Sequence, residues 1–126
     1  MAGIVVRSAH YPGRAPVDSY GNGGFRFAGM SHRGSLLLLP SGIYGWDNDG
    51  RIDRETLARV FDEAAAIEVL LIGTGREMLP LAPDLLAALR EVGIVSEPMS
   101  TGAAVRTFNV LLAEDRAVAA ALVAVD

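Results

Sequence analysis

The segment Val69-Leu70-Leu71-Ile72-Gly73 is continuously apolar up to its closing glycine and stands between two stretches with helical periodicity. A short apolar run of this kind is typical of a strand that is buried on both faces of a parallel sheet. Parallel strands need crossover connections, which are usually helices. The segment therefore predicts a β-α-β-α-β arrangement in the second half of the chain and an α/β layered fold.

The sequence on either side of this strand predicts two helices. Before it, Asp53 is the expected N-cap and Glu55 lies favourably in the first turn. After it, Pro83 occupies a first-turn position and Gly93 is the expected C′ residue. The apolar positions expected to face the core are Leu57, Val60, Phe61 and Ala64 in the first helix, and Leu85, Leu86, Leu89 and Val92 in the second.

A third helix and two more strands complete this half of the chain. Residues 94–98 are predicted to form a strand that ends at Pro98, and Ser100 or Thr101 caps the helix that follows. Residues 117–123 supply the last strand after a turn at 114–116. The third helix is expected to direct Ala104, Phe108, Leu111 and Leu112 toward the core.

Residues 17–46 follow a different pattern, in which short strands alternate with turns. Phe25 and Phe27 flank Arg26 with the period of two that marks a half-buried strand, and the apolar strand at 34–39 is closed by Pro40. The connections are too short for crossovers, so this part is predicted to be an antiparallel β meander. We expect one domain over residues 1–126, with residues 1–16 as an extended N-terminal arm.

The composition excludes several classes of function. The chain has no cysteine, and therefore no disulfide, thiolate metal site or cysteine nucleophile. All eleven basic residues are arginines, scattered along a chain of net charge −4, which argues against a nucleic-acid partner. The apolar runs are far shorter than the ~20 residues of a membrane helix, and the N-terminus lacks a signal-peptide core. We therefore expect a cytoplasmic protein without membrane insertion.

Several landmarks occur together in an order that resembles a known family. They are Asp18-Ser19-Tyr20, Gly24-Phe25, the leucine-rich strand before Pro40, Trp46, Ile72-Gly73-Thr74-Gly75, and Thr101 with Ala104 leading to Thr107-Phe108-Asn109. The sequence is similar to the domain-of-unknown-function family that includes the mitochondrial complex I assembly factor 3 proteins and many bacterial relatives. The similarity runs from about residue 16 to residue 124. It departs from some relatives at Ala103, where asparagine often stands.

The resemblance carries expectations about fold and role. It implies a three-layer (β+α/β/α) domain, with a central mixed sheet, an added antiparallel β layer from the N-terminal meander, and three helices. The assembly-factor role belongs to the mitochondrial branch of the family, and a bacterial relative need not share it.

One candidate ligand site follows from the residues themselves. Gly73, Thr74, Gly75 and Arg76 follow the buried strand, at the place where α/β proteins often bind anions. Ser100 and Thr101 open the third helix, whose first N–H groups lack helical partners. If the two preceding strands are neighbours, both segments meet at one edge of the sheet and form a pocket for a small anion. Ordinary turn formation and helix capping explain the same residues without any ligand.

Three further residues have two interpretations each. Thr107 and Asn109 flank Phe108 inside the third helix, and Asn109 is expected to make a specific hydrogen bond, either to a neighbouring segment or within the pocket. Trp46 is a candidate anchor for a partner, or else a core residue. No spacing indicates catalytic residues, a metal site or a cofactor.

The sequence thus leaves two hypotheses of function. The first is a non-enzymatic interaction or assembly-factor-like domain, with a protein partner or a second copy of the chain. The alternative is a small-molecule or anion-binding protein, with enzymatic activity left open, that uses residues 73–76 and the start of the third helix.

Overall fold

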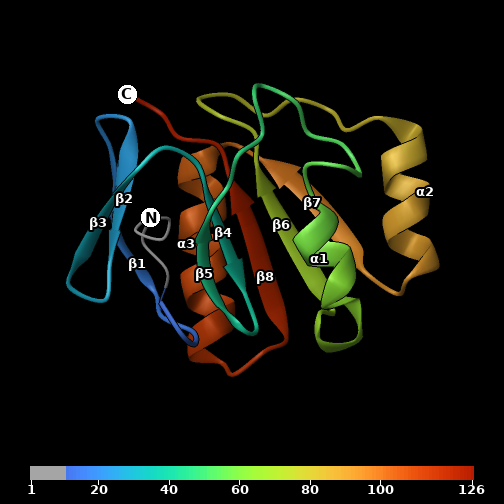
Figure 1. Cartoon of the computed structure of the whole chain (residues 1–126), viewed down its shortest axis with the longest axis horizontal. Coiled ribbons are helices and arrows are strands. Elements are labelled where there is room, and N and C mark those ends of the chain that lie inside the picture. Colours follow the sequence, from blue (N-terminus) through green and yellow to red (C-terminus); the bar gives the residue numbers. More distant parts are fainter. Residues whose placement is uncertain (1–10) are drawn as a thin grey trace, which may run out of the picture.

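The computed structural model describes residues 11–126, which fold into eight strands, three α-helices and one 3-10 helix (Figure 1). The strands are β1 (Val17–Gly21), β2 (Gly24–Phe27), β3 (Met30–Arg33), β4 (Leu36–Leu39), β5 (Gly42–Gly45), β6 (Val69–Gly73), β7 (Val95–Met99) and β8 (Val118–Leu122). The helices are α1 (Ala58–Asp62), the 3-10 helix η2 (Ala64–Ala66), α2 (Pro83–Glu91) and α3 (Thr101–Ala113). The α/β class and the three helices are confirmed.

The strands form two sheets. The central sheet has five strands in the order β5-β4-β8-β6-β7, and β1, β2 and β3 form a separate three-stranded sheet. β4 runs antiparallel to β5 and β8, whereas β6 runs parallel to both β7 and β8. The central sheet is therefore mixed, as expected. The meander divides between the sheets, because β4 and β5 join the central one while β1–β3 remain apart.

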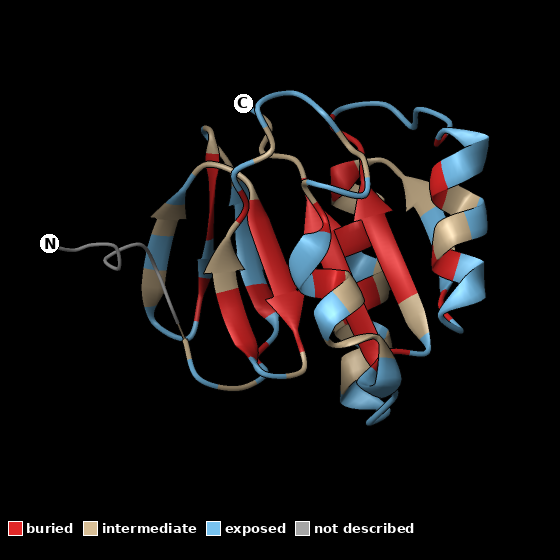
Figure 2. Ribbon diagram, turned by 45° about the vertical axis from the view of Figure 1, so that its right-hand side comes forward, coloured by how far each residue is buried: buried red, intermediate tan, exposed pale blue. Residues whose placement is uncertain are grey.

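Both faces of the central sheet are buried. Along β4, Leu36 and Leu38 face one apolar cluster while Leu37 and Leu39 face the other. The first cluster includes Phe108 of α3 together with residues of the small sheet, and the second includes residues of α1 and α2. Figure 2 shows the resulting band of buried strands between partly exposed helices. Helices thus cover both faces, and the small sheet adds a further β layer beside α3.

The two edges of the central sheet are protected in different ways. At β5, Tyr11 and Ile43 exchange two backbone hydrogen bonds, of 3.1 and 2.9 Å, so Tyr11 pairs with this edge at one position. At β7, the N–H of Val95 donates to the carbonyl of Glu68, and the carbonyl of Met99 accepts from the N–H of Thr74. In this register the backbone nitrogen of Pro98 points away from β6, toward the open edge of the sheet. Proline has no N–H to offer a further strand, which discourages sheet extension at this edge. The predicted arm at residues 1–16 lies within the described residues only from Tyr11 onward.

The first helix begins later than the sequence predicts. α1 has Leu57 as its N-cap residue, without a side-chain cap. Asp53 caps the turn before it: its Oδ1 accepts from the N–H of Thr56 at 2.9 Å, and Thr56 Oγ1 accepts from the N–H of Asp53 at 3.1 Å. This reciprocal arrangement resembles a capping box displaced by one turn. Ala64, expected in the helix, lies in η2.

The second helix ends as expected but orients one residue differently. Gly93 follows the C-cap Val92, and the N–H of Ile94 donates to the carbonyl of Leu89 at 3.0 Å, as in a Schellman motif. Val92 was predicted to face the core, but it is 39% exposed. The helix closes at Glu91, so the chain leaves the helical path before Val92 can continue the buried stripe.

Candidate functional site

The loop after β6 and the first turn of α3 meet at the carboxyl edge of the central sheet. The N–H of Thr101 donates to the carbonyl of Gly75 at 2.7 Å, and the N–H of Gly75 donates to Thr101 Oγ1 at 3.1 Å. The same hydroxyl donates to the carbonyl of Val123 at 2.7 Å. Thr101 is fully buried and ties three segments together. The convergence expected from neighbouring parallel strands is therefore present.

Gly73 makes this close approach sterically feasible. A Cβ at this position would lie 2.9 Å from the Cα of Thr101 and 3.0 Å from Cδ2 of Leu122. Real Cβ contacts are longer, so a larger residue would push α3 away from β6. Gly73 thus serves the packing of helix against strand, behind the surface of the site.

Thr74 organises the loop that follows. Its Oγ1 donates to the carbonyl of Glu77 at 2.6 Å and accepts from the N–H of Leu79 at 2.9 Å, and the residue is 7% exposed. A buried hydroxyl therefore fixes residues 74–79 as a compact turn. Beyond it, Met78 and Leu79 are 56% and 55% exposed.

A cavity of about 260 Å³ opens beside this junction. It is lined by Gly75 and Arg76 of the loop, by Ser100, Gly102 and Arg106 at the start of α3, and by Tyr20 and Val125. Among the residues that the sequence singled out for the ligand site, Gly75, Arg76 and Ser100 line the cavity. Gly73, Thr74 and Thr101 stand behind them and hold the walls in place.

Thr107 and Asn109 lie farther along α3 and do not line the cavity. Asn109 is eight residues beyond Thr101, which is about 12 Å along a helix axis. Its Oδ1 accepts from the N–H of Val17 at 2.9 Å, and its Nδ2 donates to the carbonyl of Val17 at 2.8 Å. Asn109 therefore fastens β1, and with it the small sheet, to α3.

Tyr20 was not recognised as a site residue from the sequence. It belongs to β1, is 42% exposed, and its hydroxyl approaches Gly102 so closely that a Cβ on that residue would collide with it. The same Cβ would lie 3.6 Å from Nη1 of Arg106. Because β1 is remote from α3 in the chain, these groups meet through the packing of the small sheet against α3.

The lining of the cavity is rich in hydrogen-bond donors. Within residues 11–126, neither Arg76 nor Arg106 forms an ion pair with an acidic residue. Thr101 and Ala103 of the first turn of α3 donate to Gly75 and Ser100, whereas the N–H of Gly102 has no partner among the described residues. Among the described residues that line the cavity, none carries a side-chain carboxylate. The site therefore combines two arginines with the positive end of a helix.

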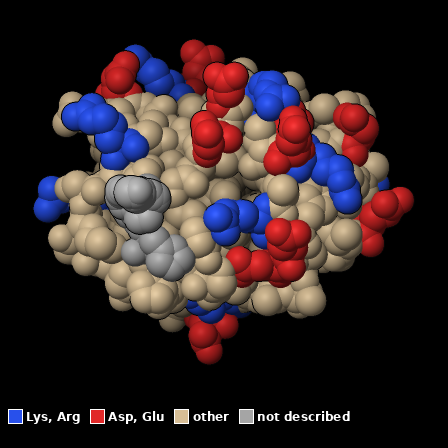
Figure 3. Space-filling view, viewed as in Figure 1, with Lys and Arg blue, Asp and Glu red and all other residues tan. Residues whose placement is uncertain are grey.

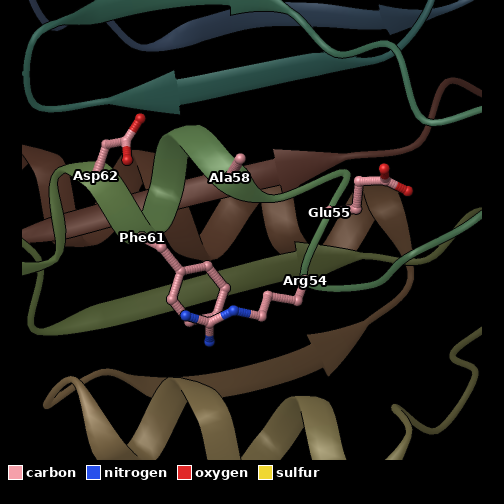
Figure 4. Close-up of a pocket in the computed structure, with 5 residues that line it drawn as sticks. All are labelled: Arg54, Glu55, Ala58, Phe61 and Asp62. Atoms are coloured by element: carbon pink, nitrogen blue, oxygen red, sulfur yellow. The ribbon is translucent and has the colours of Figure 1, made fainter.

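A second hollow lies on the outer side of α1 (Figure 4). The guanidinium of Arg54 stacks over the ring of Phe61 with its carbon 4.2 Å from the centroid, while Glu55 and Asp62 point away from this pair. The lining thus mixes both signs of charge and includes its own cation–π contact. Nothing in this arrangement selects one ligand chemistry.

Trp46 is a core residue rather than a surface anchor. It is 5% exposed, belongs to the cluster beneath α1 and α2, and its indole N–H donates to the carbonyl of Thr56 at 2.8 Å. The core interpretation of this residue is the one that the structure supports, because the ring is not presented to solvent.

The rest of the described surface does not indicate a particular kind of ligand. On the face in Figure 3, arginines are interspersed with acidic residues instead of forming one basic patch. In the part of the chain that the structure describes, no group of three or more histidine, aspartate or glutamate residues could hold a metal ion. The helices of residues 11–126 include none with the length and apolar character needed to cross a membrane.

Together, the mixed five-stranded sheet, the helices on both faces and the extra β layer define a three-layer α/β domain. The chain belongs to the family described as a protein of unknown function (DUF498/DUF598), whose model matches residues 17–123. The family resemblance indicated by the sequence motifs is therefore confirmed.

Three proteins are similar to this chain over most of its length. The chain is 38% identical over 119 residues to an uncharacterised protein of Rhodobacter capsulatus, covering 94% of this chain and 92% of that protein. It is 32% identical over 122 residues to NADH dehydrogenase (ubiquinone) 1 alpha subcomplex assembly factor 3 of Mus musculus, covering 95% of this chain but only 66% of that protein. A crystal structure described as an outer membrane protein from Bartonella henselae has a TM-score of 0.90 and 64% identity, covering 93% of this chain and 100% of that one.

Proposed function

We propose that this domain is a non-enzymatic interaction module of the assembly-factor kind, which binds a protein partner through the edge of the sheet around the cavity. The observation that carries this proposal is the loop at residues 74–79. The buried hydroxyl of Thr74 fixes the loop and leaves Met78 and Leu79 more than half exposed beside Arg76.

Exposed apolar side chains on an ordered loop are a common form of interface anchor. Burying them against a partner removes apolar surface from water, at about 25 cal/mol per Å². Because the loop is already fixed by hydrogen bonds, binding costs less conformational entropy than the ordering of a flexible segment would. Tyr20, which also lines the cavity, adds a partly exposed aromatic ring of the kind that is enriched in interfaces.

The similarity to an assembly factor supports an interaction role. The similarity to the Mus musculus assembly factor spans 95% of this chain, so it includes the loop, the start of α3 and β1. The lining of the cavity also suits binding, since it offers donors from arginine, tyrosine and a helix terminus. We therefore propose that the site recognises a protein partner.

Affinity capture from the native host tests this proposal. We expect the tagged chain to retain one partner that withstands washing, and a double substitution of Met78→Glu and Leu79→Glu to abolish that retention. The matched control is Val110→Glu, because Val110 is 57% exposed on α3. The partner is then purified and its complex with each variant measured by calorimetry. Equal binding of the double variant and the wild type would refute the proposal.

A further inference from the structure

We propose that the cavity is a clamp for a single carboxylate group, held between Arg76 and Arg106, and that this group is supplied by a protein partner. The inference rests on the proposed interaction role for the source of the carboxylate, but not for the chemistry of the clamp. It names the kind of group that a partner must present to this edge of the sheet.

The charges of the cavity point to an anion. Two arginines from separate elements line one space of about 260 Å³, and neither is neutralised by an acidic residue within residues 11–126. Elsewhere in that range, Arg51 pairs with Asp53 and Glu55 at 3.1 and 3.3 Å. In a chain of net charge −4, two unpaired arginines that share a cavity form a local excess of positive charge.

The packing at Gly102 brings two polar groups to the wall of the cavity. The hydroxyl of Tyr20 and Nη1 of Arg106 both approach Gly102, where any Cβ would displace the tyrosine. Glycine at this position leaves room for the two polar groups. Its own N–H, in the first turn of α3, has no hydrogen-bond partner among residues 11–126.

The rest of the lining favours a carboxylate on an apolar stem. Guanidinium groups bind planar carboxylates through paired hydrogen bonds. Beside them, Val125 and the partly exposed ring of Tyr20 provide apolar surface for the carbon chain that bears the carboxylate. A bare inorganic anion would leave this apolar part of the lining unused.

The test is a titration of the whole chain, monitored by amide NMR, with four probes. They are acetyl-Leu-Ala with a free carboxyl terminus, the same dipeptide as its amide, sodium acetate and sodium phosphate. We expect saturable shifts at Gly75, Arg76 and Gly102 with the free acid and none with the amide. Arg76→Gln and Arg106→Gln should each weaken binding about tenfold or more, since each removes a charged hydrogen-bond donor.

Arg90→Gln is the matched control, because Arg90 is an exposed arginine of α2 remote from the cavity, and its loss should change binding less than twofold. If all three variants lost the same affinity for the free acid, the effect would be one of net charge, and the clamp proposal would be wrong. Tighter binding of inorganic phosphate than of either carboxylate would also overturn it. Equal affinity for acetate and the peptide acid would keep the clamp but overturn the assignment of its carboxylate to a protein partner.

The outcomes also separate this inference from the proposed function. If Arg76→Gln and Arg106→Gln leave partner capture intact, the assignment of the carboxylate to the partner is wrong while the interaction role stands. If the free acid binds as expected but no partner is ever captured, the carboxylate site stands and the interaction role is wrong.

Discussion

The hydroxyl of Thr101 donates a hydrogen bond to the carbonyl oxygen of Val123 across 2.7 Å, and thereby joins the first turn of α3 to the segment after β8. The same oxygen accepts the N–H of Gly75. One buried side chain therefore sets the relative positions of the loop, the helix start and the C-terminal segment that surround the cavity. The geometry of the proposed site depends on this contact.

Replacing Thr101 with valine should destabilise the domain by about 2 to 4 kcal/mol. Valine keeps the shape of the side chain but leaves the buried N–H of Gly75 without a partner, at about 1 to 3 kcal/mol, and also removes the hydrogen bond to the partly buried carbonyl of Val123, at about 1 kcal/mol. Urea denaturation monitored by Trp46 fluorescence measures the loss. Thr101→Ser, which retains the hydroxyl, should lose only about 1 kcal/mol. A valine variant as stable as the serine variant would contradict this account.

Replacing Asn109 with alanine should loosen the small sheet before the rest of the molecule. The substitution removes both hydrogen bonds to Val17 and should cost about 2 kcal/mol. Hydrogen exchange should accelerate in β1 and β2, while the amides of β6 stay protected. Val110→Ala is the neighbouring control and should have little effect. Uniform acceleration across both sheets would show that Asn109 does not act locally.

Replacing Asp115 with glycine should stabilise the domain by about 0.5 to 1 kcal/mol. Asp115 has φ +58° at the C′ position of α3, a conformation that glycine adopts without steric cost. Its carboxylate also stands at the negative end of the helix, where an acidic group is unfavourable. The ion pair with Arg14, at 4.0 Å and fully exposed on the Asp115 side, contributes little. Thermal unfolding measures the change, and a lower midpoint for the glycine variant would contradict the prediction.

Acid should weaken the turn before α1. The backbone hydrogen bond from Thr56 holds the pKa of Asp53 below its ordinary value, and the nearby charge of Arg51 acts in the same direction. A lowered pKa in the folded state stabilises the fold above pH ~4 and ceases to do so as the pH falls through the folded pKa. Asp53→Asn should therefore lose stability less steeply than the wild type as the pH falls below about 4. Parallel pH curves for the two proteins would show that the Asp53 carboxylate makes no such contribution.

Much of the fold followed from the sequence because its signals are local. The apolar run at residues 69–73, the alternation of Phe25 and Phe27, and the stop at Gly93 are set by side chains close in the chain. The start of α1 was misplaced because Asp53 and Thr56 satisfy each other in a turn, which the capping pattern alone does not distinguish from a helix start. Val92 was misassigned because a helical period was continued past the end of the helix.

The candidate site could be predicted only in part from the sequence. The convergence of Gly75, Arg76 and Ser100 follows from the rule that parallel strands end at one edge. Tyr20 and Val125 reach the cavity through tertiary packing, for which no local pattern exists. Thr107 and Asn109 were grouped with the site by sequence proximity, although the helix rise carries them away from it.

Site-specific photocrosslinking in the native host tests the central claim most directly. A benzophenone side chain is placed at Leu79 or, for comparison, at Val110, which is equally exposed on α3. The account predicts one discrete adduct, containing the partner found by affinity capture, from position 79 and none from position 110. Equal adducts from both positions, or an adduct from position 110 alone, would contradict it.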